Sequence, residues 1–224
     1  MKRLVALLSV VMLLLIAAVA YSYLKPTAAP SGPITADPVS TPSGDTDARV
    51  FTISQEGSQA RFIIDEVLNG SPKTVVGTTN QVAGQISIDP NDVSSTRVGT
   101  IRINVRTFQT DSSQRDRAIQ NRILETSSYE FITFTPREIT GLPGDPAIGR
   151  TYNLKITGDL KIKDVSREVT FDVTVKPESQ SRLTGKATAT IKYADWGISI
   201  PQVPFVANVS DEVRLELDFL AVSS

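Results

Sequence analysis

Hydrophobic and polar residues alternate along most of the chain beyond residue 50, and this period constrains the fold more than any other feature. In a β-strand, such alternation places hydrophobic side chains on one face and polar side chains on the other. The final segment shows the pattern most clearly, with Val213, Leu215, Leu217, Phe219 and Ala221 alternating with Glu212, Arg214, Glu216 and Asp218. We expect further strands at residues 51–54, 60–68, 82–88, 101–106, 131–139, 152–162, 168–175 and 183–193.

Strands with one polar face and one apolar face are typical of antiparallel sheets, whereas parallel sheets bury both faces of their strands. Turn residues separate the predicted strands, notably at Asn69–Pro72, Asp89–Asp92 and Gly141–Pro146. The apolar faces must be buried against each other, in either a sandwich or a barrel. Several predicted strands are about ten residues long, which is long for a small sandwich and favours an antiparallel barrel.

Residues 112–124 break the period of two and predict one short amphipathic helix. Ile119 and Ile123 are four positions apart, which places them on one face of such a helix. Asp111 or Ser112 can cap its N-terminus. We expect this helix to cover one end of the barrel.

The N-terminal segment 1–25 has the features of an export signal. Lys2 and Arg3 precede a mostly apolar run from Leu4 to Leu24. Ala18–Ala20 offers a small-x-small cleavage site, which would leave a secreted or periplasmic protein. The run is also long enough to span a bilayer as a helix. We favour an uncleaved apolar helix that anchors the chain to the cell membrane, with the domain outside the cytoplasm.

Residues 26–47 predict an extended linker. They contain five of the chain's 13 prolines, with small and polar residues between them. Such a composition cannot bury a core and favours semi-rigid extended chain. We expect a spacer between the membrane and a single domain of residues 48–224, which is long enough for a substantial core.

Composition excludes several classes of protein. The chain has 23 Lys and Arg against 24 Asp and Glu, so it lacks the basic excess expected of a nucleic-acid binder. It contains no histidine and no cysteine, which excludes His-dependent or thiolate nucleophiles and the usual zinc ligands. It also lacks the glycine-rich motifs that cradle nucleotides. We therefore expect a protein that is not an enzyme and that needs neither metal nor cofactor.

Several motifs, in their order and spacing, resemble the YceI-like family of exported lipid-binding proteins. The most specific is Thr157–Val169, which is similar to the family hairpin Gly-x-Leu-x-Ile-x-Gly-Val-Thr-Lys-x-Val. The others are Phe51–Ile53, Ser58–Phe62, Val82–Pro90, Arg115–Asp116, Tyr129–Phe134, Asp195–Gly197 and Asp211–Val213. The chain departs from the family pattern in three places: Glu130 replaces a proline, Asp164 replaces a glycine, and the histidine often found after Arg-Asp is missing.

The resemblance implies a lipocalin-like barrel of about eight strands whose lumen binds a long apolar chain, such as a polyisoprenoid or an isoprenoid quinone, for storage or transport. Small inward residues at Gly185, Ala187 and Ala189, with Gly84 and Gly158, leave room for such a guest. Alternatively, they fit the barrel's curvature and are filled by larger neighbours. In that case the chain is an exported structural or stress-related interaction module without a lipid.

The candidate lining of the lumen and its mouth is Ile86, Ile103, Val105, Leu154, Ile156, Phe171, Val173, Gly185, Ala187, Ala189, Trp196 and Phe219. Trp196 either lines the mouth or fills the core. Arg115 either meets a lipid headgroup or forms an ion pair that fixes the helix, and we favour the ion pair. The sequence indicates no oligomeric state.

Overall fold

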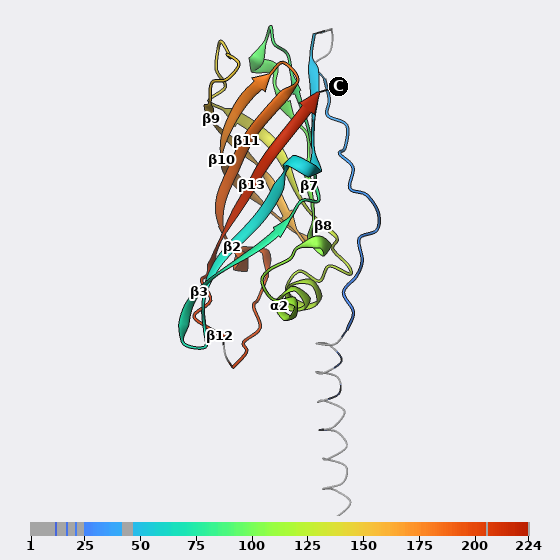
Figure 1. Ribbon diagram of the computed structural model, residues 1–224, viewed down its shortest axis with the longest axis vertical. Coiled ribbons are helices and arrows are strands. Elements are labelled where there is room, and N and C mark those ends of the chain that lie inside the picture. The colour runs from blue at the N-terminus through green and yellow to red at the C-terminus, as the bar shows by residue number, and fades with distance from the viewer. Residues whose placement is uncertain are drawn as a thin grey trace, which may run out of the picture.

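The computed structural model describes residues 12, 17, 21, 25–41, 47–204 and 206–223, and its main element is one curled antiparallel β-sheet (Figure 1). Its strands are β1 (Arg49–Ile53), β2 (Gln59–Leu68), β3 (Ser71–Thr79), β4 (Val82–Ala83), β5 (Gln85–Ile88), β6 (Arg97–Val98), β7 (Ile101–Asn104), β8 (Phe131–Thr140), β9 (Tyr152–Ile162), β10 (Val165–Ser179), β11 (Arg182–Lys192), β12 (Val206–Ala207) and β13 (Glu212–Ser223).

The helical elements are short. Helix α2 (Ser113–Ala118) continues into the π-helical turn η4 (Ile119–Ile123). Four 3₁₀ turns interrupt or connect strands, namely η1 (Gln55–Gly57), η2 (Val93–Ser95), η3 (Val105–Thr107) and η5 (Tyr193–Trp196). The prediction of an all-β antiparallel fold with one short helix is therefore confirmed.

The order of the strands explains the curl of the sheet. Hydrogen bonding runs in the order β4-β7-β8-β9-β10-β11-β13-β1-β5-β6. Strands β4 and β5 lie near opposite ends of this order, yet only Gly84 separates them along the chain. Strand β13 also pairs with β2 through its first half, and β2 pairs with β3. Consecutive segments β1–β2, β3–β5 and β6–β7 are thus each arranged as one interrupted strand beside β8–β11 and β13.

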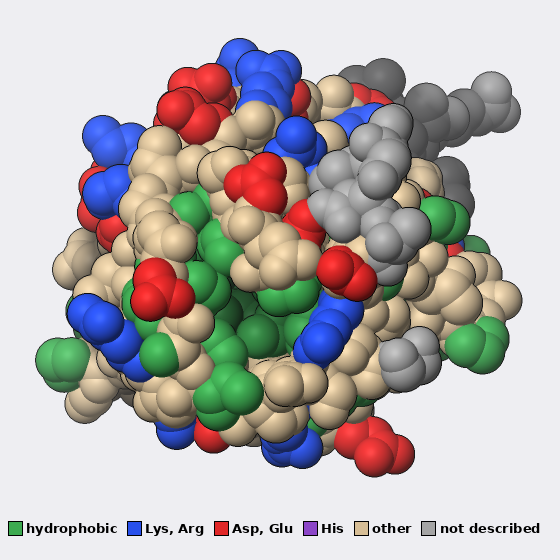
Figure 2. Space-filling model, turned by 90° about the horizontal axis from the view of Figure 1, so that it is seen from above, with side chains coloured by type: hydrophobic (Ala, Val, Ile, Leu, Met, Phe, Trp, Pro, Cys, Tyr) green, Lys and Arg blue, Asp and Glu red, His purple; other side chains and the backbone are tan. Residues whose placement is uncertain are grey.

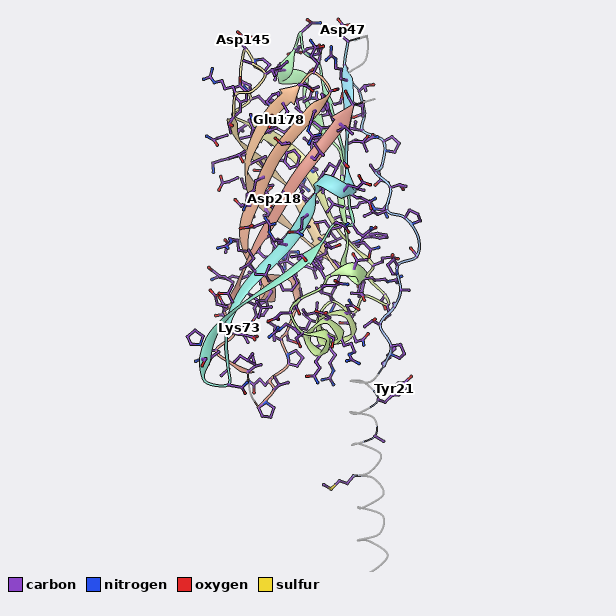
Figure 3. All side chains as sticks on the ribbon, viewed as in Figure 1. Tyr21, Asp47, Lys73, Asp145, Glu178 and Asp218 are labelled. Atoms are coloured by element: carbon purple, nitrogen blue, oxygen red, sulfur yellow. The ribbon has the colours of Figure 1, made fainter. Side chains whose placement is uncertain are left out.

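The two ends of the sheet differ. Helix α2, η4 and η5 lie at one end, called the helix end below (Figure 1). The β8–β9 loop and the β10–β11 turn lie at the other, called the far end, where Figure 3 labels Asp145 and Glu178. A tilted β2–β3 hairpin extends along the helix end and pairs there with β12.

The buried hydrophobic side chains form two clusters inside the sheet. The first contains Phe51, Ile53, Ala60, Val82, Ile101, Val173, Leu183, Phe219 and Ala221. The second, nearer the helix end, contains Leu160, Ile162, Val169, Ile191, Trp196 and Ile198. Their strand residues follow the inward register, because alternate residues of each strand share one face.

The N-terminal predictions fall largely on residues that the structure does not describe. Residues 1–24, apart from Met12, Ala17 and Tyr21, lie outside the described residues, and so does most of the predicted apolar helix. Within the described part of the chain, no helix is long and apolar enough to cross a membrane. Residues 25–41 contain no helix or strand and run along the outside of the sheet from the helix end towards the far end (Figure 1).

Candidate lipid cavity

A cavity of about 280 Å³ occupies the interior of the curled sheet. Nearly all strands contribute hydrophobic side chains to its wall, because the wall is the inward face of the sheet. The strand residues are Ile53, Ala60, Phe62, Ile64, Val75, Ile86, Val98, Ile101, Ile103, Ile132, Phe134, Ile156, Leu160, Ile162, Phe171, Val173, Ala187, Ile191, Val213, Leu215, Leu217 and Phe219. The rings of Phe134 and Phe171 meet edge to face, with centroids 4.8 Å apart.

Helix α2 and η4 form part of the wall at the helix end. Ile119, Ile123 and Leu124 all border the cavity. The helix begins where predicted, because the Ser112 hydroxyl accepts a hydrogen bond from the Arg115 N–H at 3.4 Å. Asp116 fixes the preceding turn, since its Oδ1 accepts hydrogen bonds from both the N–H and the hydroxyl of Thr110. The helix therefore turns its apolar face towards the lumen.

An ion pair borders the cavity at the helix end. Glu66 lies in the inward register of β2, and its carboxylate is 2.7 Å from Nη2 of Arg115. The Glu66 side chain is only 8% exposed. Arg115 also pairs with Asp111, whose other oxygen lies 2.5 Å from Nζ of Lys73. The hydrogen bond from Lys73, with the charge of Arg115, lowers the pKa of Asp111. Arg115 therefore forms the predicted ion pair, and its charge is balanced.

A charged cluster lies at the junction of β2 and β13, on the outer face of these strands, because Arg61 and Glu216 alternate with the cavity-lining Ala60 and Leu217. Nη2 of Arg61 is 3.2 Å from Oε2 of Glu216, and Nζ of Lys186 is 2.9 Å from the same oxygen. The hydrogen bond from Lys186 is the main reason that the pKa of Glu216 is lowered. The charges of Glu66 and Arg115 at the helix end are paired with each other, and a guest meets an almost wholly apolar wall.

The far end of the curled sheet is hollowed. Figure 2, which looks onto this end, shows hydrophobic side chains at the bottom of a central depression, with charged and neutral polar groups around it. An apolar hollow with a polar rim suits the burial of an apolar guest. Among the described residues, no group of three acidic, histidine or cysteine side chains is placed to hold a metal ion.

Seven of the twelve predicted lining residues border the cavity, namely Ile86, Ile103, Ile156, Phe171, Val173, Ala187 and Phe219. The other five lie elsewhere in the core. Val105 is buried in η3, and Leu154 packs against the first cluster. Ala189 packs against the second cluster, to which Trp196 belongs. A ligand-binding role for any of the twelve stays a prediction.

Gly185 does not leave open space. A Cβ atom added there would come closer than 3.0 Å to both the Phe219 ring and the Thr174 carbonyl oxygen. At Gly158, an added Cβ would meet Thr135 and Pro136 in the same way. These glycines allow neighbouring rings and strands to approach closely, as the alternative interpretation of the small residues expected. Ala187 is the small inward residue that does border the cavity.

Sequence reasoning missed most of the lining residues, and two groups among them show why. Phe62, Ile64 and Glu66 share the inward register of β2, so the period of two was a sufficient signal for them. Ile200 and Val209 come from the irregular segment between η5 and β13, where no period indicates which side chains face inward.

Comparison with known proteins finds a matching family model and a related bacterial protein. The family model of the YceI-like domain matches residues 51–221. A UPF0312 protein of Staphylococcus aureus (strain N315) is 27% identical over 159 residues, which cover 68% of this chain and 84% of that protein.

Three solved structures are similar in fold. A polyisoprenoid-binding domain from Saccharophagus degradans, implicated in plant cell wall breakdown, has a TM-score of 0.61 and 14% identity over 78% of this chain and 98% of its own. BcnA of Burkholderia cenocepacia has a TM-score of 0.57 and 21% identity over 76% and 99%. A YceI protein of Campylobacter jejuni has a TM-score of 0.52 and 18% identity over 66% and 84%. At these identities the likeness concerns the fold alone.

Proposed function

Since the chain belongs to the YceI-like family, we propose that its barrel binds a long-chain apolar lipid, such as a polyisoprenoid or an isoprenoid quinone, for storage or transport. The observation that carries this proposal is the apolar cavity of about 280 Å³ inside the sheet. The similarity in fold to a polyisoprenoid-binding domain from Saccharophagus degradans supports the choice of lipid class.

Apolar burial supplies the driving force in this proposal. Removing a methylene group from water contributes about 0.8 kcal/mol, so an isoprenoid tail gains affinity with every unit that enters the lumen. Because Glu66 and Arg115 at the wall are paired with each other, binding needs no charge on the guest. The proposed activity is binding without chemistry.

We further propose that the domain lies outside the cytoplasm, held by the apolar run Leu4–Leu24. Full-length protein should then sediment with membranes and stay there through a high-salt wash. Recovery of only a soluble mature form that begins near Tyr21 would replace the anchor with a cleaved signal peptide, without affecting the lipid proposal.

Ala187→Phe tests the cavity. Its ring would enter space that a guest needs, so organic extraction followed by mass spectrometry should recover much less lipid than from the wild type. The melting temperature of the delipidated variant should change little, because the cavity has room for the ring. Delipidated samples are required, since a bound ligand itself raises apparent stability.

Thr188→Phe is the matched control. Thr188 neighbours Ala187 on the same strand and therefore points to the opposite face. This variant should retain the lipid content of the wild type.

A filled barrel that serves as an exported interaction module is the second candidate, and the close contacts at Gly185 favour it. It predicts no lipid in extracts of the wild type. It also predicts that Ala187→Phe lowers stability by about 1–3 kcal/mol through overpacking.

A further inference from the structure

Residues 25–41, called the strap below, dock along the outside of the barrel. At the helix end, Nδ2 of Asn121 donates a hydrogen bond to the Lys25 carbonyl oxygen at 2.9 Å. Lys25 also borders one groove together with Ser113 and Arg117 of α2. The first residue of the strap is thus held beside α2 and η4.

The strap is held next at Glu130, at the start of β8. Oε1 of Glu130 accepts a hydrogen bond from the Ser31 N–H at 2.8 Å. Nη1 of Arg106 lies 2.9 Å from Oε2 of Glu130 and donates to the Ala29 carbonyl oxygen at 2.9 Å. The buried Asn104 donates to Glu130 as well. Glu130 stands where the family pattern has a proline, whose side chain could accept no such bond.

The remainder of the strap continues along the sheet towards the far end. Ile34 is only 5% exposed, and its carbonyl oxygen accepts a hydrogen bond from Nε2 of Gln55 at 3.1 Å. The Val39 N–H donates to Oε1 of Gln85 at 3.0 Å. Figure 3 shows the result, with Tyr21 beyond the helix end and Asp47 at the far end.

Docking of the strap restricts how the barrel can move relative to its membrane attachment. A free chain over residues 26–47 could hold the barrel as far as about 70 Å from its attachment, in any orientation. A docked strap instead fixes the residue that follows the apolar run, Lys25, against η4 and beside α2. We propose that the strap holds the helix end of the barrel against the bilayer and directs the far end away from it.

This proposal rests on the proposed membrane anchor. The partner of the helix end is the lipid bilayer. The cavity wall at the helix end, formed by Ile123, Leu124, Ile200 and Val209, then faces the membrane. The hollow seen in Figure 2 faces the aqueous side.

Fluorescence quenching tests the orientation, because the chain has no native cysteine. Full-length protein is reconstituted into vesicles of phosphatidylcholine and phosphatidylglycerol that carry a nitroxide on a fraction of the headgroups. One fluorophore is placed on Gln114→Cys in α2 or on Gly144→Cys in the far-end loop. We expect quenching several times stronger at position 114 than at position 144.

Two strap variants give the matched comparison. Ile34→Asp places a charge in the buried contact and should make quenching at the two positions similar. Thr35→Asp adds the same charge at the exposed neighbour and should keep the difference.

The outcomes separate the two proposals. Protein that floats with the vesicles but shows equal quenching at both positions overturns the orientation alone. Equal effects of Ile34→Asp and Thr35→Asp also overturn it. Protein that fails to float with the vesicles overturns the anchor, and the orientation with it.

Discussion

Side chains are packed by opposite means near the helix end and near the far end of the curled sheet. At the helix end, large side chains fill the space between elements, and Trp196 donates a hydrogen bond from its indole N–H to the Leu160 carbonyl oxygen at 3.0 Å. At the far end, Gly185 lets the Phe219 ring and the neighbouring strand approach directly. Packing near the helix end depends on large side chains, whereas packing near the far end depends on the missing side chain of Gly185. The two ends should therefore respond oppositely to truncation and to enlargement.

Trp196→Ala should produce the largest effect. Trp196 is 4% exposed within the second cluster, so truncation leaves a cavity and removes the hydrogen bond to the Leu160 carbonyl oxygen. We expect a loss of about 3–5 kcal/mol in the free energy of unfolding, measured by urea titration. Trp196→Phe should cost less, because most of the buried surface remains. A loss below about 1 kcal/mol for Trp196→Ala would contradict the role given to this side chain.

Gly185→Ala tests the far end. The added methyl group would collide with the Phe219 ring and with backbone that cannot easily move, so we expect a loss of about 1–3 kcal/mol. Gly144→Ala is the control, because an added Cβ there meets nothing within 4 Å. An unchanged urea midpoint for Gly185→Ala would show that the far end has spare room.

Glu130→Gln tests the charged contact that holds the strap. Burial alone would raise the pKa of Glu130, but hydrogen bonds from Ser31 and Asn104 and the charge of Arg106 hold that pKa below its usual value of 4.5. A carboxylate with a lowered pKa stabilises the fold above its unfolded pKa and loses that contribution as pH falls through the folded pKa.

Stability of the wild type should therefore decline as pH falls below about 4.5, and Glu130→Gln should flatten that part of the profile. At pH 7 this variant should lose about 1–2 kcal/mol, because a hydrogen-bonded charge is removed. Urea midpoints between pH 3 and pH 7 measure both effects. A variant whose profile parallels that of the wild type throughout would exclude Glu130 as the titrating group.

Glu178→Gln should have the smallest effect. The hydrogen bond from Lys176, then that from Thr184, lowers the pKa of Glu178, which lies at the far end (Figure 3). The group is exposed, so solvent screens these interactions. We expect the same urea midpoint as the wild type at pH 7. A loss equal to that of Glu130→Gln would mean that the two ends do not differ electrostatically.

The alternation of apolar and polar residues predicts which side chains face inward. It does not predict whether the space inside the sheet is filled. It placed Val173 and Ala187 on the inward face, and both border the cavity. It placed Gly185 there as well, but alternation carries no information about whether a neighbouring ring fills the space above a glycine. Trp196 stayed ambiguous for another reason, since it ends a 3₁₀ turn outside any periodic segment.

The strap shows a second limit of prediction from sequence. Its proline content predicts an extended linker, and residues 25–41 contain no helix or strand. Its docking depends on Gln55, Gln85 and Glu130, which lie from 21 to 99 positions away along the sequence. Composition within a segment cannot reveal partners at such separations.

The position of the first strap contact bears on how the chain could mature. The small-x-small site ends at Ala20, and the strap contacts begin five positions later, at Lys25. A peptidase that cuts after Ala20 would therefore release the domain with its strap complete. Tethered and released forms would share one fold and one lumen. Processing would therefore change the location of the protein without changing which ligand it can bind.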